Sequence, residues 1–291
     1  MPNKKRNVTV EVACSKFLDW VTAKRSQNTF RMYDGRLKPF RERFGERLVT
    51  KLKPRRIEEY FAEVNKWPDG SDKAPDTVRA NVTAVEQLQK HLNKRLEIPC
   101  VLVRDGEKPI GRVRERIPTA DEITRIKEIA SPAFRLVVEA LRRSGARPNE
   151  LASATIADWK QAEFMIVLAK HKTARKTGRP RRIIVGEKFE AIIRESIGQR
   201  TDVPLFLTPQ GNPWVTDTLS QTFARYRNEL EIDRDLKLYG AGRHAFATAC
   251  YNAGFNENDI AFLMGHAGSM TQRYMHPDVM QLREKQDALS L

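Results

Sequence analysis

The amino-acid sequence predicts a mainly α-helical protein with one small β-hairpin, built as an N-terminal helical bundle followed by a larger α+β domain. Its 291 residues suit two domains better than one, since single hydrophobic cores stop growing near about 250–300 residues. Apolar residues recur at helical spacing through most of the chain, and two short runs rich in β-branched residues flank a basic loop. A content of 40% hydrophobic and 31% charged residues is typical of a folded chain rather than a disordered one.

The N-terminal part, residues 1–108, is predicted to be a compact bundle of four or five helices. Apolar side chains recur every three or four residues in four stretches, which run from Val12 to Lys24, from Asn28 to Gly45, onward from Pro54, and from Pro75 to Leu92. Prolines and basic residues then mark residues 109–118 as a linker, which either follows a phosphate backbone or is simply solvated.

Residues 119–291 are predicted to form the second domain, in which helices surround the β-hairpin. The two β-branched runs, Phe164–Leu168 and Arg182–Val185, predict strands joined by a long tip. The remaining helices are expected at 121–130, 133–144, 187–197, 217–230, 243–253 and 256–264. The polar segment 279–291 is either a short helix that docks on a neighbouring protomer or a frayed tail.

The charge of the chain is consistent with a polyanionic partner; the alternative is a basic protein that binds no nucleic acid. Lys and Arg number 52 and Asp and Glu number 37, which gives a formal net charge of +15. Residues 1–110 and residues 111–291 both carry an excess of basic side chains, so two domains can grip a nucleic acid from two sides. No apolar run approaches the roughly 20 residues of a membrane span, and no signal peptide or disulfide framework is visible. We therefore expect an intracellular protein without a membrane partner.

Five short motifs in the second domain stand out, although each is weak alone. The first places Arg147 between a helix-ending Gly and Pro148, where the guanidinium and the next helix dipole face one anion, unless the side chain is merely solvated. The second, Lys170–Arg182, has seven Lys or Arg in thirteen residues and no acid; the alternative is an exposed hairpin kept soluble by charge. The other three are GRHAFAT from Gly242, LMGH from Leu263, and MTQRYMHP from Met270.

In this order and spacing the motifs resemble those of the tyrosine recombinase (phage integrase) family. The pattern GxRxxEL, KT in a basic hairpin, RHxFAT, LxGH and a Tyr eight residues later covers a catalytic domain from about Ile117 to Pro277. The N-terminal bundle resembles the core-binding, DNA-binding domain of the same family, without a diagnostic motif. The resemblance implies a site-specific recombinase or integrase of a phage or mobile element, which cleaves and rejoins duplex DNA through a covalent 3′-phosphotyrosyl intermediate and uses no cofactor.

The resemblance assigns the nucleophile and the phosphate-binding groups. Tyr274 matches the nucleophile, and its phenol, with an ordinary pKa near ~10, needs neighbouring cations or a base to favour the ionised form. Arg273 and His276 are candidates for that help. Arg147 and Arg243 match the family's pair of arginines, whose forks bind phosphate oxygens bidentately.

Three further roles follow from the same match. Lys172 corresponds to the general acid of the hairpin, with Lys170 and Lys176 as close rivals. His266 is expected to hydrogen-bond the phosphate or the tyrosine oxygen; without the surrounding motifs it would be a capping or core His. Glu150 matches an acidic position that orients the site from behind, and a surface carboxylate is the alternative.

One position departs from the family pattern. The family usually has HxxR, and here Gly240 stands where the His is expected, three residues before Arg243. Either the glycines let a bulge bring Tyr239 towards the phosphate, or the site lacks one phosphate contact. His244, directly after the Arg, is expected to be structural.

The expected partner is double-stranded DNA with specific recombination sites, bound by a homotetramer when two sites synapse, in the cytoplasm at the nucleoid. Further cations are expected to contact DNA: Lys170, Arg175, Lys176 and Arg179 in the hairpin, and Arg31, Arg36, Arg79 and Lys90 in the bundle. No metal is expected, because no carboxylate or Cys completes a ligand spacing with His244, His266 and His276. The alternatives are a weak or inactive DNA-binding relative with a regulatory role, favoured by the missing His, and a topoisomerase-like strand transferase.

Overall fold

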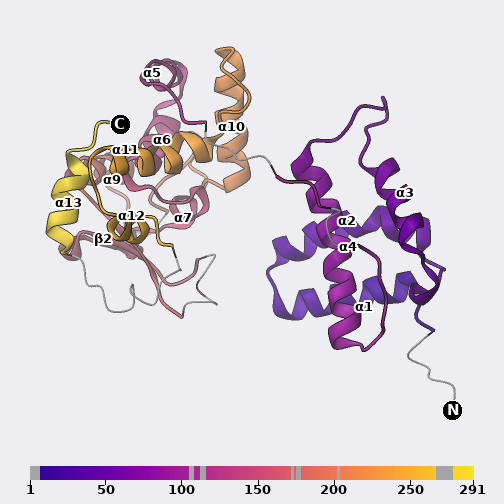
Figure 1. The fold of residues 1–291 in the computed structure, drawn as a ribbon. Coiled ribbons are helices and arrows are strands. Elements are labelled where there is room, and N and C mark those ends of the chain that lie inside the picture. Colours follow the sequence, from indigo (N-terminus) through magenta and orange to yellow (C-terminus); the bar gives the residue numbers. More distant parts are fainter. Residues whose placement is uncertain are drawn as a thin grey trace. The chain divides into compact units, whose positions relative to one another are not determined.

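The computed structural model of the chain describes residues 7–104, 108–111, 116–171, 174, 178–201, 204–266 and 278–291. The chain divides into two compact units, which we call the N-terminal unit (residues 1–113) and the C-terminal unit (residues 114–291), and each has its own buried apolar core (Figure 1). Within the described ranges, no helix has both the length and the apolar composition that crossing a membrane requires.

The N-terminal unit is a helical bundle whose helices start at side-chain caps or prolines. Its elements are α1 (Val10–Lys24), α2 (Gln27–Phe44), the 3₁₀ turn η2 (Val49–Lys51), α3 (Pro54–Val64) and α4 (Pro75–Arg95). The hydroxyls of Thr9 and Ser26 accept hydrogen bonds from the first turns of α1 and α2, so α2 begins one residue before the predicted Asn28. Fully buried Phe17, Leu37 and Leu88 pack the core between α1, α2 and α4.

The C-terminal unit places its helices around a small sheet. Its helices are α5 (Ala120–Ile129), α6 (Pro132–Ser144), α7 (Pro148–Ser153), α9 (Glu187–Ile197), α10 (Thr216–Glu229), α11 (Ala245–Asn252), α12 (Glu257–Leu263) and α13 (Val279–Asp287). Short 3₁₀ turns, η3 (Ile156–Asp158) and η4 (Gln161–Glu163), flank the first strand. The predicted fold class, mainly helical with a small β element, is confirmed.

The sheet has three antiparallel strands in the order β1 (Trp159–Lys160), β2 (Met165–Leu168) and β3 (Arg181–Ile184). Strands β2 and β3 are the two arms of the predicted hairpin, and Leu168 pairs with Arg181 at the base of its basic tip. Strand β1 was not predicted, because two residues carry no alternating pattern.

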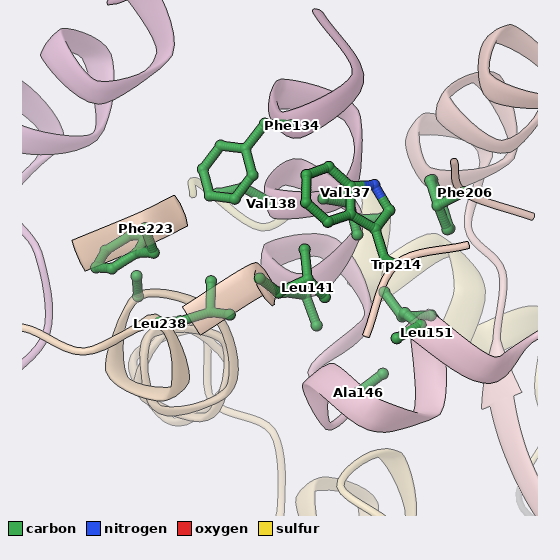
Figure 2. Packing of buried hydrophobic residues seen from close by; sticks show 14 of the residues in the cluster. Phe134, Val137, Val138, Leu141, Ala146, Leu151, Phe206, Trp214, Phe223 and Leu238 are labelled. Atoms are coloured by element: carbon green, nitrogen blue, oxygen red, sulfur yellow. The ribbon is translucent and has the colours of Figure 1, made fainter. Parts of the chain in front are cut away.

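The main core of the C-terminal unit lies around α6 and fixes the turn into α7. Figure 2 shows Phe223 and Leu238 on one side of α6 and Trp214 and Leu151 on the other. These four side chains and Ala146 are at most 4% exposed. Because Ala146 and Leu151 are anchored in this core, the intervening start of α7 has a fixed backbone path.

The segment before α11 departs from the predicted helix 243–253. Residues Gly240–His244 form a π-helical turn, η5, before α11 continues as an ordinary helix. Arg142, buried on α6, donates a hydrogen bond to the Ala241 carbonyl at 3.0 Å. Gly242 lies so close to α6 that an added Cβ would be 3.0 Å from the Cβ of Leu141. Packing against α6 therefore accommodates the wider turn.

The C-terminal helix α13 packs on its own unit. The carboxylate of Asp287 accepts hydrogen bonds from the backbone N–H groups of Glu187 (2.6 Å) and Lys188 (3.1 Å), at the start of α9. Leu282 and Leu289 are 1% and 3% exposed. The expected short helix is present, and its residues Leu282 and Asp287 have partners within the same unit rather than fraying; docking on a neighbouring protomer stays a prediction.

Candidate active site

Arg147 lies where the chain turns from α6 into α7. Gly145 ends α6 with φ of 60°, and an added side chain there would collide with the ring of Phe246. Arg147 precedes Pro148, the first residue of α7. Its guanidinium Nη1 lies 2.6 Å from Oε1 of Glu150, while Oε2 of Glu150 accepts a hydrogen bond from the Arg147 backbone N–H at 3.0 Å. Glu150 thereby fixes both the backbone and the side chain of Arg147.

The carboxylate of Glu150 is fully buried and remains charged. Burial alone would raise its pKa, but Arg181, followed by the backbone and side chain of Arg147, lowers the pKa below its ordinary value. Arg181 lies 3.4 Å from Oε2 through its Nε. Nothing in the sequence distinguishes Arg181, because within the run Lys170–Arg182 it is one of seven Lys or Arg residues.

Arg243 lies on the π-helical turn η5 and is 2% exposed. Its Nη1 donates to the Gly145 carbonyl at 2.7 Å, and its Nη2 donates to the carbonyl of Met264. Burial and the nearby Arg147 charge lower the pKa of the Arg243 guanidinium, and Tyr239 opposes that shift. The group stays protonated at neutral pH, because an Arg pKa starts far above that range.

His266 follows the turn that ends α12. Gly265 has φ of 59°, and His266 comes next with an exposed side chain. Partial burial, then the charges of Arg243, Arg147 and Arg181, lower the pKa of the imidazole below its ordinary value near 6.5. The structure thus brings Arg147, Arg243 and His266 from three separate segments into one electrostatic neighbourhood, with His266 neutral at pH 7.

Tyr239 immediately precedes the π-helical turn and meets Arg243. Tyr239 is among the groups that raise the pKa of the Arg243 guanidinium, its ring contacts the ring of His244 edge-on at 5.2 Å, and the residue is 40% exposed. A Cβ added to Gly240 would lie 2.5 Å from the backbone oxygen of Arg116. The position of the expected His therefore has no room for a side chain, and its neighbour Tyr239 faces the arginine.

A pocket of about 380 Å³ opens beside these residues. Its lining includes Arg147, Asn149, Thr216, Ser220, Phe223, Lys237 and Tyr239. Four cationic or phenolic residues thus line this concave space: Arg147, Arg227, Lys237 and Tyr239. Across the described ranges, no three His, Cys, Asp or Glu side chains gather into a cluster that could hold a metal ion.

Several predicted residues lie outside the described residues, and their roles stay predictions: Lys172, Arg175, Lys176, Arg273, Tyr274 and His276. In the described part of the hairpin, Lys170 and Arg179 are exposed. Residues 171 and 179 are in contact, since Nε2 of His171 lies 2.9 Å from the Arg179 carbonyl oxygen.

The four cations predicted to contact DNA from the N-terminal unit differ in their surroundings. Arg31 is exposed on α2. The others have partners within the unit: Arg36 with Asn81 (2.8 Å), Arg79 with the Pro109 carbonyl (3.1 Å) and Lys90 with Glu86 (2.7 Å). Each of those three would have to exchange or share its partner to bind a phosphate.

Comparisons with known proteins agree with this arrangement. The model of the family described as the phage integrase family matches residues 117–280, more than half of the chain. No curated protein sequence matches the chain.

Solved structures of similar fold cover nearly the whole chain. A lambda integrase dimer bound to a COC′ core site is 17% identical with a TM-score of 0.72, over 96% of either chain. A lambda integrase tetramer bound to a Holliday junction is 15% identical with a TM-score of 0.72, over 96% of this chain and 82% of that one. The Tn1549 transposon integrase in complex with transposon right-end DNA is 16% identical with a TM-score of 0.69, over 96% of this chain and 99% of that one. At these identities the likeness concerns the fold.

Proposed function

The chain belongs to the phage integrase family, and from this premise we propose that it is a site-specific DNA recombinase that cleaves and rejoins duplex DNA through a 3′-phosphotyrosyl intermediate. The observation that carries the proposal is that Arg243 donates to the carbonyls of Gly145 and Met264, which lie two residues before Arg147 and His266. Two guanidiniums and a neutral imidazole provide several N–H donors around one anion, which suits a phosphodiester.

The two arginines stabilise the charge that develops on the non-bridging oxygens of the scissile phosphate. Glu150 holds the guanidinium of Arg147, and the Gly145 carbonyl holds that of Arg243. Donors fixed before the reaction need little reorganisation when the transition state forms. Neutral His266 donates its N–H to a phosphate oxygen or to the oxygen of the nucleophile.

Tyr274 is the proposed nucleophile. Its phenol loses its proton to the surrounding water, and the oxygen attacks phosphorus, forming an O–P bond. The bond from phosphorus to the 5′ oxygen breaks, and that oxygen leaves with the electron pair and takes a proton from Lys172. Attack by another 5′-hydroxyl reverses these steps and releases Tyr274, so that no external energy source is needed.

The proposed partner is duplex DNA, with both basic units in contact with it. Lambda integrase and Tn1549 integrase are solved with DNA, lambda integrase also as a tetramer on a Holliday junction. We extend that behaviour to this chain, as a homotetramer acting at the nucleoid in the cytoplasm. The net charge of +15 supports it, because phosphate neutralisation dominates the affinity for DNA.

A second candidate function is that of a DNA-binding relative with little or no cleavage activity. The observation in its favour is Gly240, which offers no side chain at the usual His position and no room for one. Such a protein would bind the recombination site and regulate recombination without forming a covalent adduct.

The deciding experiment is a suicide-substrate assay on nicked DNA that carries the ends of the element. Cleavage releases a short strand and traps the covalent complex, which is resolved on a denaturing gel. Wild-type protein should become trapped, and Tyr274→Phe should not. The matched control is Tyr251→Phe, since Tyr251 lies on α11 of the same unit and is 72% exposed.

Three results separate the candidates. Trapping of wild type and of Tyr251→Phe, but not of Tyr274→Phe, supports the proposed nucleophile. An adduct with Tyr274→Phe contradicts the assignment. Tight binding to a verified target site without any adduct from wild type favours the DNA-binding relative.

A further inference from the structure

Arg181, the first residue of β3, is a buried cation that no step of the mechanism above uses. Its side chain is 3% exposed. Its charge is compensated by Glu150 and by three backbone carbonyls, those of Arg182 (2.6 Å), Phe262 (3.3 Å) and Leu263 (2.6 Å). A buried charge is strongly destabilising unless it is paired and hydrogen-bonded, and this one is held by both kinds of partner.

Two of these carbonyls belong to the end of α12. Carbonyls in the last turn of a helix have no intrahelical partner and carry the negative end of the helix dipole, so a cation is favourable there. The next carbonyl along the chain, that of Met264, accepts from Arg243. Arg181 and Arg243 therefore bind three consecutive carbonyls, Phe262 to Met264, directly before the turn that carries His266.

The turn itself lies against the Arg181 guanidinium. A Cβ added to Gly265 would lie 2.6 Å from Nε of Arg181, and Gly265 has φ of 59°. Only glycine suits both the conformation and the contact. The position of Arg181 therefore determines the direction in which the chain continues from Gly265 to His266.

The other side of Arg181 reaches the phosphate-binding arginine through Glu150. Nε lies 3.4 Å from Oε2 of Glu150, and Oε1 of the same carboxylate lies 2.6 Å from Arg147. Among the groups that lower the pKa of Glu150, Arg181 acts most strongly. One guanidinium is thus shared between the support of Arg147 and the support of His266.

We propose that Arg181 is a positioning residue that holds Arg147, through Glu150, and His266, through the end of α12, in one arrangement around the scissile phosphate. Its place at the base of the hairpin, opposite Leu168, also ties the strand that leads to Lys172 to that arrangement. The inference deepens the proposed function and rests on it.

The test compares Arg181→Gln and Arg181→Lys with a matched control, Arg200→Gln. Arg200 lies in the same unit and likewise donates to backbone carbonyls, among them Ile197 (3.0 Å) and Pro204 (3.1 Å). Two quantities are measured on the full chain: the rate of adduct formation on the nicked substrate, and the pKa of the His266 imidazole by NMR, assigned with His266→Gln. The charges that act on His266 are those of Arg243, Arg147 and Arg181.

Arg181→Gln removes a like charge, so the His266 pKa should rise. Arg181→Lys keeps the charge, so it should restore the pKa towards the wild-type value. Because Lys lacks the planar fork, its adduct formation should stay about 10- to 100-fold slower than wild type. Arg200→Gln should change neither quantity below its unfolding temperature.

Either an unchanged His266 pKa in Arg181→Gln or a wild-type rate in Arg181→Lys overturns the proposal. If Arg181→Gln fails to fold, the rate can still be measured with Arg181→Lys. If wild-type protein forms no adduct at all, the proposed function fails, whereas the titration of His266 still tests the placement by Arg181.

Discussion

Backbone carbonyls hold the key guanidinium groups of this protein. Arg181 and Arg243 are 4% and 2% exposed, and both donate to carbonyls at helix ends. Carbonyls at helix ends have free acceptor capacity, so each of these hydrogen bonds satisfies a buried donor. The positions of Arg181 and Arg243 are consequently set by the path of the backbone, whereas that of Arg147 is set by the Glu150 carboxylate.

Tyr239 is the residue whose contribution to the rate is easiest to isolate. Tyr239→Phe should slow adduct formation about 10- to 100-fold, because the hydroxyl would donate a hydrogen bond to the charged phosphate, and such a bond contributes about 1.5–3 kcal/mol. The ring contact with His244 stays, so folding and DNA affinity should change little. Single-turnover rates on the nicked substrate, with binding measured in parallel, give both quantities.

A rate equal to wild type in Tyr239→Phe would show that the phenol hydroxyl does not compensate for Gly240. Tyr251→Phe again provides the control for loss of an exposed tyrosine hydroxyl in the same unit.

At the scale of elements, the packing of α4 against α1 contains a buried titratable group. His91 is 7% exposed, and neither of its ring nitrogens has a hydrogen-bond partner among the described residues. Its ring lies 5.4 Å from those of Phe17 and Trp20. Burial and the charge of Arg95 lower its pKa below the ordinary value of 6.5.

The stability of the N-terminal unit should therefore depend on pH through His91. A folded-state pKa below that of the unfolded chain means that protonation favours unfolding. Stability should be complete above about pH 6.5 and should fall as the pH drops below it. Amide hydrogen exchange in peptides of α1 and α4, corrected for the intrinsic rate, should show weaker protection at pH 5.5 than at pH 7.5.

His91→Leu supplies the comparison for that measurement, because an apolar side chain of similar size has no proton to gain. Its protection should be nearly independent of pH over the same interval. An equal loss of protection in His91→Leu and in wild type would assign the effect to another group.

Most helices were predictable from the sequence, and the exceptions have local physical causes. Apolar periodicity and caps such as Ser131, whose hydroxyl accepts from the Phe134 N–H, mark helix starts within a few residues. The helix was predicted from residue 243, and a bulge at the preceding glycines was only one of two alternatives. Apolar periodicity does not reveal a π-helical turn, which here is held by Arg142 on another helix.

The site was predictable to the extent that its residues stand in local motifs. Arg147, Arg243 and His266 each lie beside a glycine that ends or bends a helix, and that signal is short-range. Arg181 had no such signal, since its burial depends on carbonyls about eighty residues away in the chain, at Phe262 and Leu263. Long-range contacts decide which cation in a basic run is buried.

For the whole molecule, the main question is how many of the basic residues take part in catalysis and how many only bind the DNA backbone. If only Arg147, Lys172 and Arg243 met phosphates, the logarithm of DNA affinity against the logarithm of salt concentration would have a slope of about −2.7, at about −0.9 per neutralised phosphate. We expect a steeper slope, because both parts of the chain carry an excess of basic residues. Affinity measured between low and physiological salt gives this slope directly.

Single substitutions can show how much each basic residue contributes to that slope. Arg31→Gln should make it shallower by about one, since Arg31 is exposed on α2. Lys188→Gln should leave it unchanged, because Lys188 donates to the Asp287 carbonyl at 2.7 Å, within the contact between α9 and α13. A slope no steeper than about −3 for wild type would confine DNA contact to the catalytic groups.

The π-helical turn before α11 also determines which residues near Arg243 lie on the same face of the helix. In an α-helix an extra residue rotates everything beyond it by about 100°. A π-helical turn takes up an extra residue locally, so the helix beyond it is not rotated by that amount. A helix can thus hold an extra residue next to Arg243 while its flanks keep their faces.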